Sequence, residues 1–153
     1  MKFFEERVLK DSIEIKATVE KVWDFFDNLD LNYKSWHPES HIKCRWIKGR
    51  PHEEGSVAYF EEILDGNICK IKVLCTKVDK YERVECKSLF PLSIFHPKGI
   101  YLFESKVNRC IFTAINVMRI PTIFNSKILS LVDATEKHMK EEGENLKKII
   151  EYQ

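Results

Sequence analysis

Long apolar runs, an excess of one charge and cysteine motifs are all missing from this sequence. No run approaches the roughly 20 apolar residues that a membrane-spanning helix needs. The 153 residues carry 25 Lys and Arg against 24 Asp and Glu, and the net charge of +1 argues against broad electrostatic binding to nucleic acid or an anionic membrane. The five cysteines form no C-x-x-C motif, so neither a disulfide framework nor a zinc knuckle is expected.

Other absences narrow the class of protein further. The sequence has no G-x-S-x-G motif, P-loop or dinucleotide fingerprint, which sets aside the enzyme classes built on those motifs. No internal repeat, linker or low-complexity segment divides the chain, so residues 1–153 are predicted to form a single domain. The N-terminus becomes acidic at Glu5 before an apolar signal-peptide core can form, and this predicts a cytoplasmic protein.

Hydrophobic periodicity divides the chain into strands and helices. Ile13, Ile15 and Ala17 alternate with polar residues and predict a strand, after which Thr18 is placed to cap a helix. Alternating stretches predict six further strands, over residues 41–47, 56–64, 68–78, 83–89, 100–106 and 110–118. From residue 125 to 152 only Gly143 opposes a helix, which is then about 40 Å long.

This order of elements predicts an α+β fold. It consists of a curved antiparallel sheet of about seven strands around a long C-terminal helix, with one or two short helices after the first strand. A sheet that wraps around one helix usually leaves a cavity between them. Such a cavity is the expected site for a small hydrophobic or aromatic molecule.

Two polar residues interrupt the apolar stripe of the C-terminal helix. The stripe consists of Ile128, Leu131, Thr135, His138, Glu142, Leu146 and Ile149. His138 and Glu142 are one helical turn apart, which is the spacing by which a helix presents two ligands to one metal ion. The alternative is that His138 is an ordinary buried histidine whose partner is Glu142, or that Glu142 reaches solvent.

The Asp65-Gly66 pair predicts a two-residue hairpin turn between two strands. In that register Glu62 lies opposite Cys69, and both side chains point to the apolar inner face, where a lone carboxylate is energetically costly. A three-residue loop would slip the register by one and send Glu61 inward instead. Glu62 is therefore the favoured inward carboxylate.

The segment Trp36-His37-Pro38-Glu39-Ser40-His41 places two histidines immediately before a strand. His37 precedes the strand and is free to turn inward. Strict alternation puts His41 on the face opposite to Cys44, which disfavours His41 as an inward ligand. Both histidines are also compatible with a surface loop.

Together these segments resemble the 2,4-diacetylphloroglucinol hydrolase family of the START/Bet v 1-like (SRPBCC, helix-grip) superfamily. The similar features are the W-H-P-x-x-H segment, the inward strand glutamate and H-x-x-x-E on the last helix. The resemblance implies a helix-grip fold and a zinc ion, held by two histidines and two glutamates, that serves to cleave the bond between an acetyl group and an aromatic ring. The implied metal ligands are His37, Glu62, His138 and Glu142.

The resemblance also assigns supporting roles. His41 is then an alternative ligand or a residue that orients one, and Ser40 is a candidate contact for the substrate. Glu62 or Glu142 doubles as the catalytic proton carrier.

The sequence thus predicts a metal-dependent hydrolase, with zinc or another divalent transition metal, that acts on a small aromatic or polyketide-like ketone. Two other functions stay open. One is a non-catalytic carrier or sensor of a hydrophobic ligand. The other is a metal-free cyclase or dehydratase that uses His138 and Glu142 as an acid–base pair.

Overall fold

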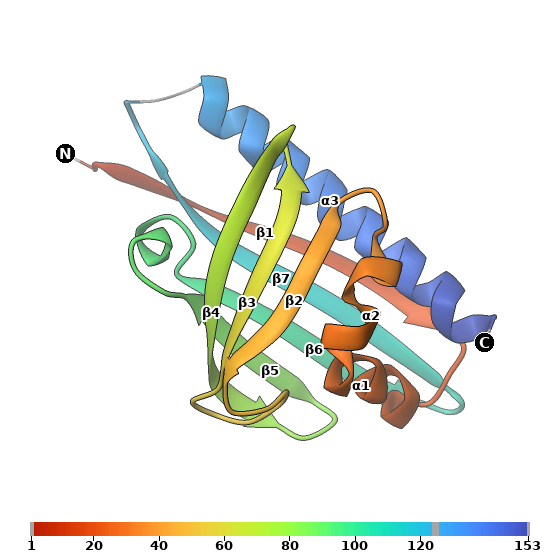
Figure 1. Cartoon of the computed structure of the whole chain (residues 1–153). Helices are drawn as coiled ribbons and strands as arrows, with labels where there is room; N and C mark the ends of the chain where they lie inside the picture. The colour runs from red at the N-terminus through yellow and green to blue at the C-terminus, as the bar shows by residue number, and fades with distance from the viewer. Residues whose placement is uncertain (1, 124–125, 153) are drawn as a thin grey trace.

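A seven-stranded antiparallel sheet wraps around one long helix in the computed structural model, which describes residues 2–123 and 126–152 (Figure 1). This architecture confirms the predicted α+β arrangement. The elements follow in the order β1 (Phe4–Ile15), α1 (Val19–Asp27), α2 (Leu29–Trp36), β2 (His41–Lys48), β3 (Val57–Leu64), β4 (Asn67–Asp79), β5 (Arg83–Ser88), the 3-10 helix η1 (Leu92–Ile94), β6 (Lys98–Lys106), β7 (Arg109–Pro121) and α3 (Ser126–Glu151).

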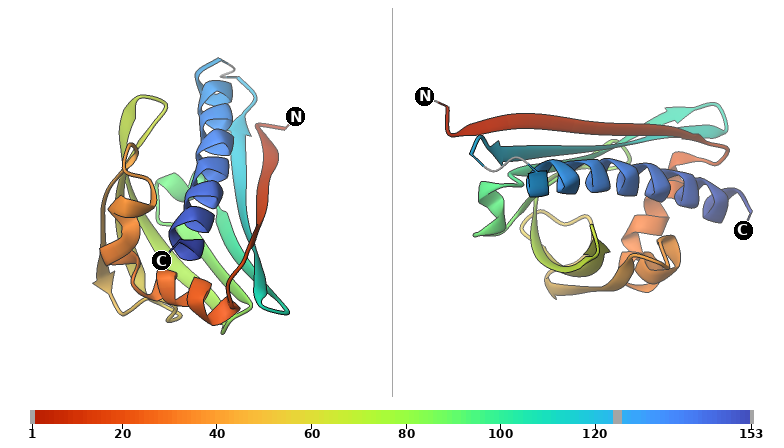
Figure 2. Two further views of the ribbon diagram at one scale, coloured as in Figure 1. Left: turned by 90° about the vertical axis from the view of Figure 1, so that its right-hand side faces the viewer. Right: turned by 90° about the horizontal axis from the view of Figure 1, so that it is seen from above.

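The sheet has the strand order β1-β7-β6-β5-β4-β3-β2, so the first strand pairs with the last one. Its concave side faces α3, and α1 and α2 lie together at one end of the molecule (Figure 2). Gly143 lies where α3 crosses β1, and a Cβ atom there would come within 2.8 Å of the Asp11 Oδ2 atom. The glycine that weakens the helix locally therefore allows helix and strand to approach closely.

Local sequence signals account for the turns that position the strands. The Thr18 side chain accepts a hydrogen bond from the Lys21 N–H and caps α1, as predicted. Asp65 and Gly66 have φ angles of 52° and 76°, the left-handed values that a two-residue hairpin of this type requires. The resulting register pairs Glu62 with Cys69, which confirms the predicted inward orientation of Glu62.

Strand β2 does not follow the predicted alternation. His41 is opposite Glu62, but Lys43 is opposite Glu61, so Ile42 is an extra residue in a β-bulge. Because of this bulge His41 and Cys44 both point inward, and His41 is only 1% exposed whereas Ile42 is 38% exposed. The prediction that His41 lies on the outer face was therefore wrong, because alternation breaks at an inserted residue.

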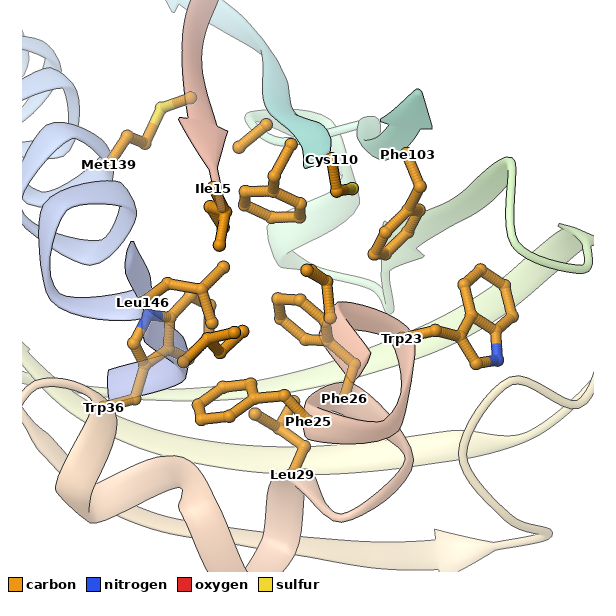
Figure 3. Close-up of a cluster of buried hydrophobic side chains, with 14 of the residues drawn as sticks. Ile15, Trp23, Phe25, Phe26, Leu29, Trp36, Phe103, Cys110, Met139 and Leu146 are labelled. Carbon is orange, nitrogen blue, oxygen red and sulfur yellow. The ribbon is translucent and has the colours of Figure 1, made fainter. Parts of the chain in front are cut away.

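One half of the interior is a tightly packed core (Figure 3). It lies between α1, α2, the second half of α3 and the concave side of the sheet. Aromatic side chains fill most of it, and the Phe26 ring packs against Trp36 and Phe112. The core includes Ile15, Val22, Trp23, Phe25, Phe26, Leu29, Trp36, Phe103, Cys110, Phe112, Leu146 and Ile150.

The other half of the interior is less completely filled. The inward side chains that face the first half of α3 are half-buried rather than buried, and they include Phe60, Ile71, Val73, Tyr101 and Met118. The facing residues of α3 are also half-buried, namely Ile128, Leu131 and Thr135. Since α1 and α2 cover only the packed half, these inward side chains keep part of their surface accessible to solvent.

The helix α3 buries a stripe that is shifted from the predicted one. Its buried residues are Val132, Met139, Gly143, Leu146 and Ile150. His138 and Glu142 border this stripe and are half-buried, so they lie beside the less filled half of the interior. Two surface hollows of about 380 Å³ and 600 Å³ lie elsewhere, along α3, and none of the candidate site residues lines them.

Candidate functional site

Four polar side chains from three elements converge inside the molecule. Each offers one ligand atom, and these atoms all lie within 4.8 Å of one another. We call this group the four-residue cluster. It consists of His41, Glu62, His138 and Glu142.

The distances within the four-residue cluster suit a single metal ion. Glu142 Oε1 lies 2.8 Å from His41 Nε2 and 3.0 Å from His138 Nε2. Glu62 Oε2 lies 3.5 Å from His138 Nε2 and 3.9 Å from His41 Nε2. Neighbouring ligand atoms around tetrahedral zinc are about 3.3 Å apart, given bonds of about 2.0–2.1 Å. Imidazole nitrogens and carboxylate oxygens are also ligands that zinc and similar divalent ions prefer.

His41 is oriented as a metal-binding histidine would be. Its Nδ1–H donates to the Tyr33 carbonyl oxygen at 2.8 Å, which directs Nε2 into the cluster, where it can donate a proton to Glu142 or, once deprotonated, bind a metal ion. The Nε2 atoms of His41 and His138 are 3.2 Å apart. Two unprotonated nitrogens would repel at that distance, so at least one of them carries a proton or both bind a metal ion.

Tyr33 holds two members of the cluster. Its ring stacks on the His41 ring with centroids 3.9 Å apart and an interplanar angle of 1°. Its hydroxyl donates to Glu62 Oε2 at 3.0 Å. Burial, followed by the charges of Glu62 and Glu142, raises the pKa of Tyr33, so the hydroxyl stays protonated and remains a donor.

The charges of the cluster are strongly coupled. Burial alone would lower the pKa of His138, but its hydrogen bonds to Glu142 and Glu62 outweigh burial and raise the pKa to about 10. Burial alone would raise the pKa of Glu142, but hydrogen bonds from His138 and His41 outweigh burial and lower the pKa to about 2. The protein alone therefore keeps a proton on His138 and a negative charge on Glu142.

His37 and Ser40 lie next to the cluster but make other contacts. His37 Nε2 is 2.6 Å from Glu141 Oε2, one residue before Glu142, and its ring centroid is 4.9 Å from that of His138. The chain makes a turn after α2 in which the backbone N–H of His41 donates to the His37 carbonyl. The side chain of His37 contacts Glu141, whereas that of His41 contacts Glu142. The Ser40 hydroxyl donates to the Ile63 carbonyl at 2.6 Å and helps to attach β2 to β3.

Sequence patterns did not single out two residues that shape the site. Tyr33 was one of several tyrosines with no distinguishing spacing. Trp36 Nε1–H donates to the Glu142 backbone carbonyl at 2.9 Å, and thereby fixes α3 relative to α2. The signal available for Trp36 was its position directly before His37 in the W-H-P-x-x-H segment.

Comparisons with known proteins identify the fold. No family model and no curated protein sequence matches the chain. Norcoclaurine synthase from Thalictrum flavum, solved in complex with dopamine and hydroxybenzaldehyde, is 13% identical with a TM-score of 0.73 over 97% of this chain and 88% of that one. A START superfamily protein from Mycobacterium smegmatis is 9% identical with a TM-score of 0.75 over 95% of this chain and 97% of that one.

A third similar structure is the di-domain ARO/CYC protein BexL from the BE-7585A biosynthetic pathway. It is 14% identical with a TM-score of 0.74, and the match covers 94% of this chain and 49% of that one. At these identities the likeness shows the fold alone, which is the helix-grip fold of the Bet v 1/START superfamily. Among the described residues, none of the helices is long and apolar enough to cross a membrane.

Proposed function

We propose that this protein is a metal-dependent hydrolase that cleaves a carbon–carbon bond in a small aromatic or polyketide-like ketone. The four-residue cluster would hold zinc or another divalent transition metal. The observation that carries the proposal is that two imidazoles and two carboxylates meet within 4.8 Å beside the less filled half of the interior. The complex of norcoclaurine synthase with dopamine and hydroxybenzaldehyde supports small aromatic molecules as ligands of such a fold.

The reaction consumes one water molecule. The bond between the ring carbon and the carbonyl carbon breaks, the water oxygen joins the carbonyl carbon, and a proton is added to the ring carbon, so the products are a carboxylic acid and the deacylated ring. A bound divalent ion supplies a Lewis acid for the carbonyl and lowers the pKa of water to near 7. The protein must then exclude bulk water and deliver the proton to the ring.

Glu62 is better placed than Glu142 to carry that proton. Glu142 Oε1 contacts both histidines of the cluster, and its pKa is lowered. Among residues 2–123 and 126–152 each glutamate keeps one oxygen without a hydrogen-bond partner, Oε1 in Glu62 and Oε2 in Glu142, so what separates them is the lowered pKa of Glu142, which disfavours its protonation. The Tyr33 hydroxyl keeps the Glu62 carboxylate in place while its free oxygen accepts or donates a proton.

Metal analysis combined with a turnover assay tests this function. Protein purified without a polyhistidine tag should contain about one equivalent of a transition metal. It should release acetate from a polyhydroxylated acetophenone, lose this activity on chelation and regain it with zinc. His138→Ala should remove both metal and activity while the far-ultraviolet circular dichroism stays unchanged.

Other outcomes would separate the alternatives. Less than about a tenth of an equivalent of metal after reconstitution would reject the metal site. Turnover that survives exhaustive chelation would favour an acid–base pair of His138 and Glu142. Ligand binding without turnover, unaffected by His138→Ala, would favour a carrier or sensor.

Zinc binding is expected to release about one proton between pH 7 and 8, because a metal ligand must be deprotonated. The raised pKa of His138, about 10, means that this histidine is protonated in the metal-free protein at those pH values. The apparent affinity should therefore strengthen about tenfold for each unit by which the pH rises towards that pKa. Calorimetric titrations in buffers of different ionisation enthalpy measure the proton count, and a count near zero would contradict the protonated His138.

A further inference from the structure

One end of the molecule exposes an unusual number of large apolar side chains. They come from the start of β1, the connection around η1, the end of β7 and the first turn of α3, which lie together at the left in Figure 1 and in the right-hand view of Figure 2. Phe90 is 80% exposed and Ile123 is 77% exposed. We call this region the apolar end, and its exposed apolar residues are Phe3, Phe4, Phe90, Leu92, Ile94, Phe95, Ile123 and Leu129.

Hydrogen bonds hold these segments against one another. The Arg119 N–H donates to the Phe95 carbonyl at 2.8 Å, and the Thr122 N–H donates to the Phe3 carbonyl at 3.1 Å. His96 lies between Ser88 and Asn116, with hydrogen bonds of 2.8 Å to each side chain. The connection around η1 is therefore attached to β5 and β7, and its apolar side chains point outward from a fixed base.

Basic residues surround the apolar end. Between residues 86 and 132 the sequence contains a single acidic residue, Glu104, which is near the opposite end of β6. Lys98 pairs with Glu85, and on β1 Glu5 pairs with Arg7 while Glu6 is adjacent. Four further cations at this end have no carboxylate partner within the described ranges, namely Lys2, Lys87, Arg119 and Lys127. The acidic residues at this end are Glu5, Glu6, Glu85 and Asp65, whose carboxylate accepts from the Ser130 hydroxyl of α3, so the end carries a modest net positive charge.

The chemistry of this end selects among possible partners. A second copy of the chain would bring two basic ends together, which like-charge repulsion disfavours. Single-stranded nucleic acid is bound by aromatic rings that stack on bases, but only four of these eight side chains are aromatic, and the aliphatic half, such as Leu92, Ile94 and Ile123, cannot stack in this way. Apolar side chains flanked by lysine and arginine fit the interface of an anionic lipid bilayer.

We propose that the apolar end docks on a membrane surface that contains anionic lipids, with the side chains around η1 inserted among the lipids. The first half of α3 begins at this end (Figure 1), and the inward side chains that face it are half-buried. Docking would therefore bring that interior close to the phase in which hydrophobic ligands concentrate. The proposal does not depend on metal binding or on hydrolysis.

Sedimentation with sucrose-loaded vesicles tests the proposal on the full chain. Vesicles of phosphatidylcholine containing phosphatidylserine should bind the protein at least about tenfold more tightly than vesicles of phosphatidylcholine alone. The double variant Phe90→Ser/Ile123→Ser should lower binding to anionic vesicles at least about tenfold without a change of charge. Arg119→Gln/Lys127→Gln should weaken binding by a similar factor and reduce its salt dependence.

The matched control is Val107→Ser, which removes a side chain that is 90% exposed in the β6–β7 hairpin at the opposite end. It should bind vesicles as the unchanged protein does, and all variants should retain their circular dichroism. The proposal would be overturned if the protein did not bind anionic vesicles. It would also be overturned if Val107→Ser weakened vesicle binding as much as Phe90→Ser/Ile123→Ser does. Tighter binding to a single-stranded oligonucleotide, or a dimer that Phe90→Ser/Ile123→Ser dissociates, would overturn it in favour of those partners.

Discussion

Replacing His41 with alanine is expected to lower the affinity for zinc by at least about 100-fold, whereas replacing His37 with alanine should leave one zinc ion bound. The two histidines are four residues apart and both are buried, so they form a matched pair. Only His41 directs a ring nitrogen to Glu142, at 2.8 Å, while His37 contacts Glu141. Loss of His41 removes a ligand and leaves Glu142 with one histidine partner instead of two.

The measurement is competition with a chromophoric zinc chelator for each variant, together with metal content after gel filtration. His41→Gln is a useful third variant, because it keeps a polar side chain of similar length but cannot replace the imidazole as a ligand. Zinc binding that His37→Ala abolishes and His41→Ala preserves would contradict the four-residue cluster and favour the ligand set that the family resemblance implies. If both variants fold normally and lose the same amount of zinc affinity, His37 is also needed to hold the metal.

Leu146→Ala is expected to destabilise the protein by about 3–4 kcal/mol, which is a large part of the stability of a typical domain. Leu146 is 0% exposed and lies in the core among Ile15 and Trp36 (Figure 3). Truncation loses the transfer free energy of the removed carbons and leaves a cavity that the surrounding rings cannot fill without changing rotamers. Because Trp36 also holds the Glu142 carbonyl, loosening this core should weaken metal binding as well.

Urea denaturation followed by tryptophan fluorescence measures the change, with Leu31→Ala as the control. Leu31 is 78% exposed on α2, so the same substitution there should cost less than about 0.5 kcal/mol. The packed half of the interior predicts a large effect. It would be contradicted if Leu146→Ala lowered the free energy of unfolding by less than about 1 kcal/mol while the slope of that free energy against urea concentration stayed unchanged.

The fold was predictable because its signals are local. Alternation located the strands to within a few residues, Thr18 marked the start of α1, and Asp65-Gly66 fixed the β3–β4 register through backbone angles that few residues adopt. The inward orientation of Glu62 followed from that register. The pairing of His138 with Glu142 followed from helical periodicity alone.

What could not be predicted depends on contacts between distant segments. The bulge at Ile42 becomes visible only when β2 is aligned with β3. The role of Tyr33 depends on how α2 packs against both strands, since one residue supplies a carbonyl to His41 and a hydroxyl to Glu62. The division of the interior into a packed and a less filled half depends on which part of α3 the two short helices cover.

The bulge at Ile42 makes the cluster depend on chain length as well as on residue identity. With one residue fewer in β2, the same four residue types would remain in the sequence, but His41 would turn to the outer face and three inward members of the cluster would remain. A deletion or insertion of one residue can therefore remove or create the fourth member of the cluster, without any substitution at its four positions. Within this fold a single codon can thus decide whether a fourth polar side chain faces the interior.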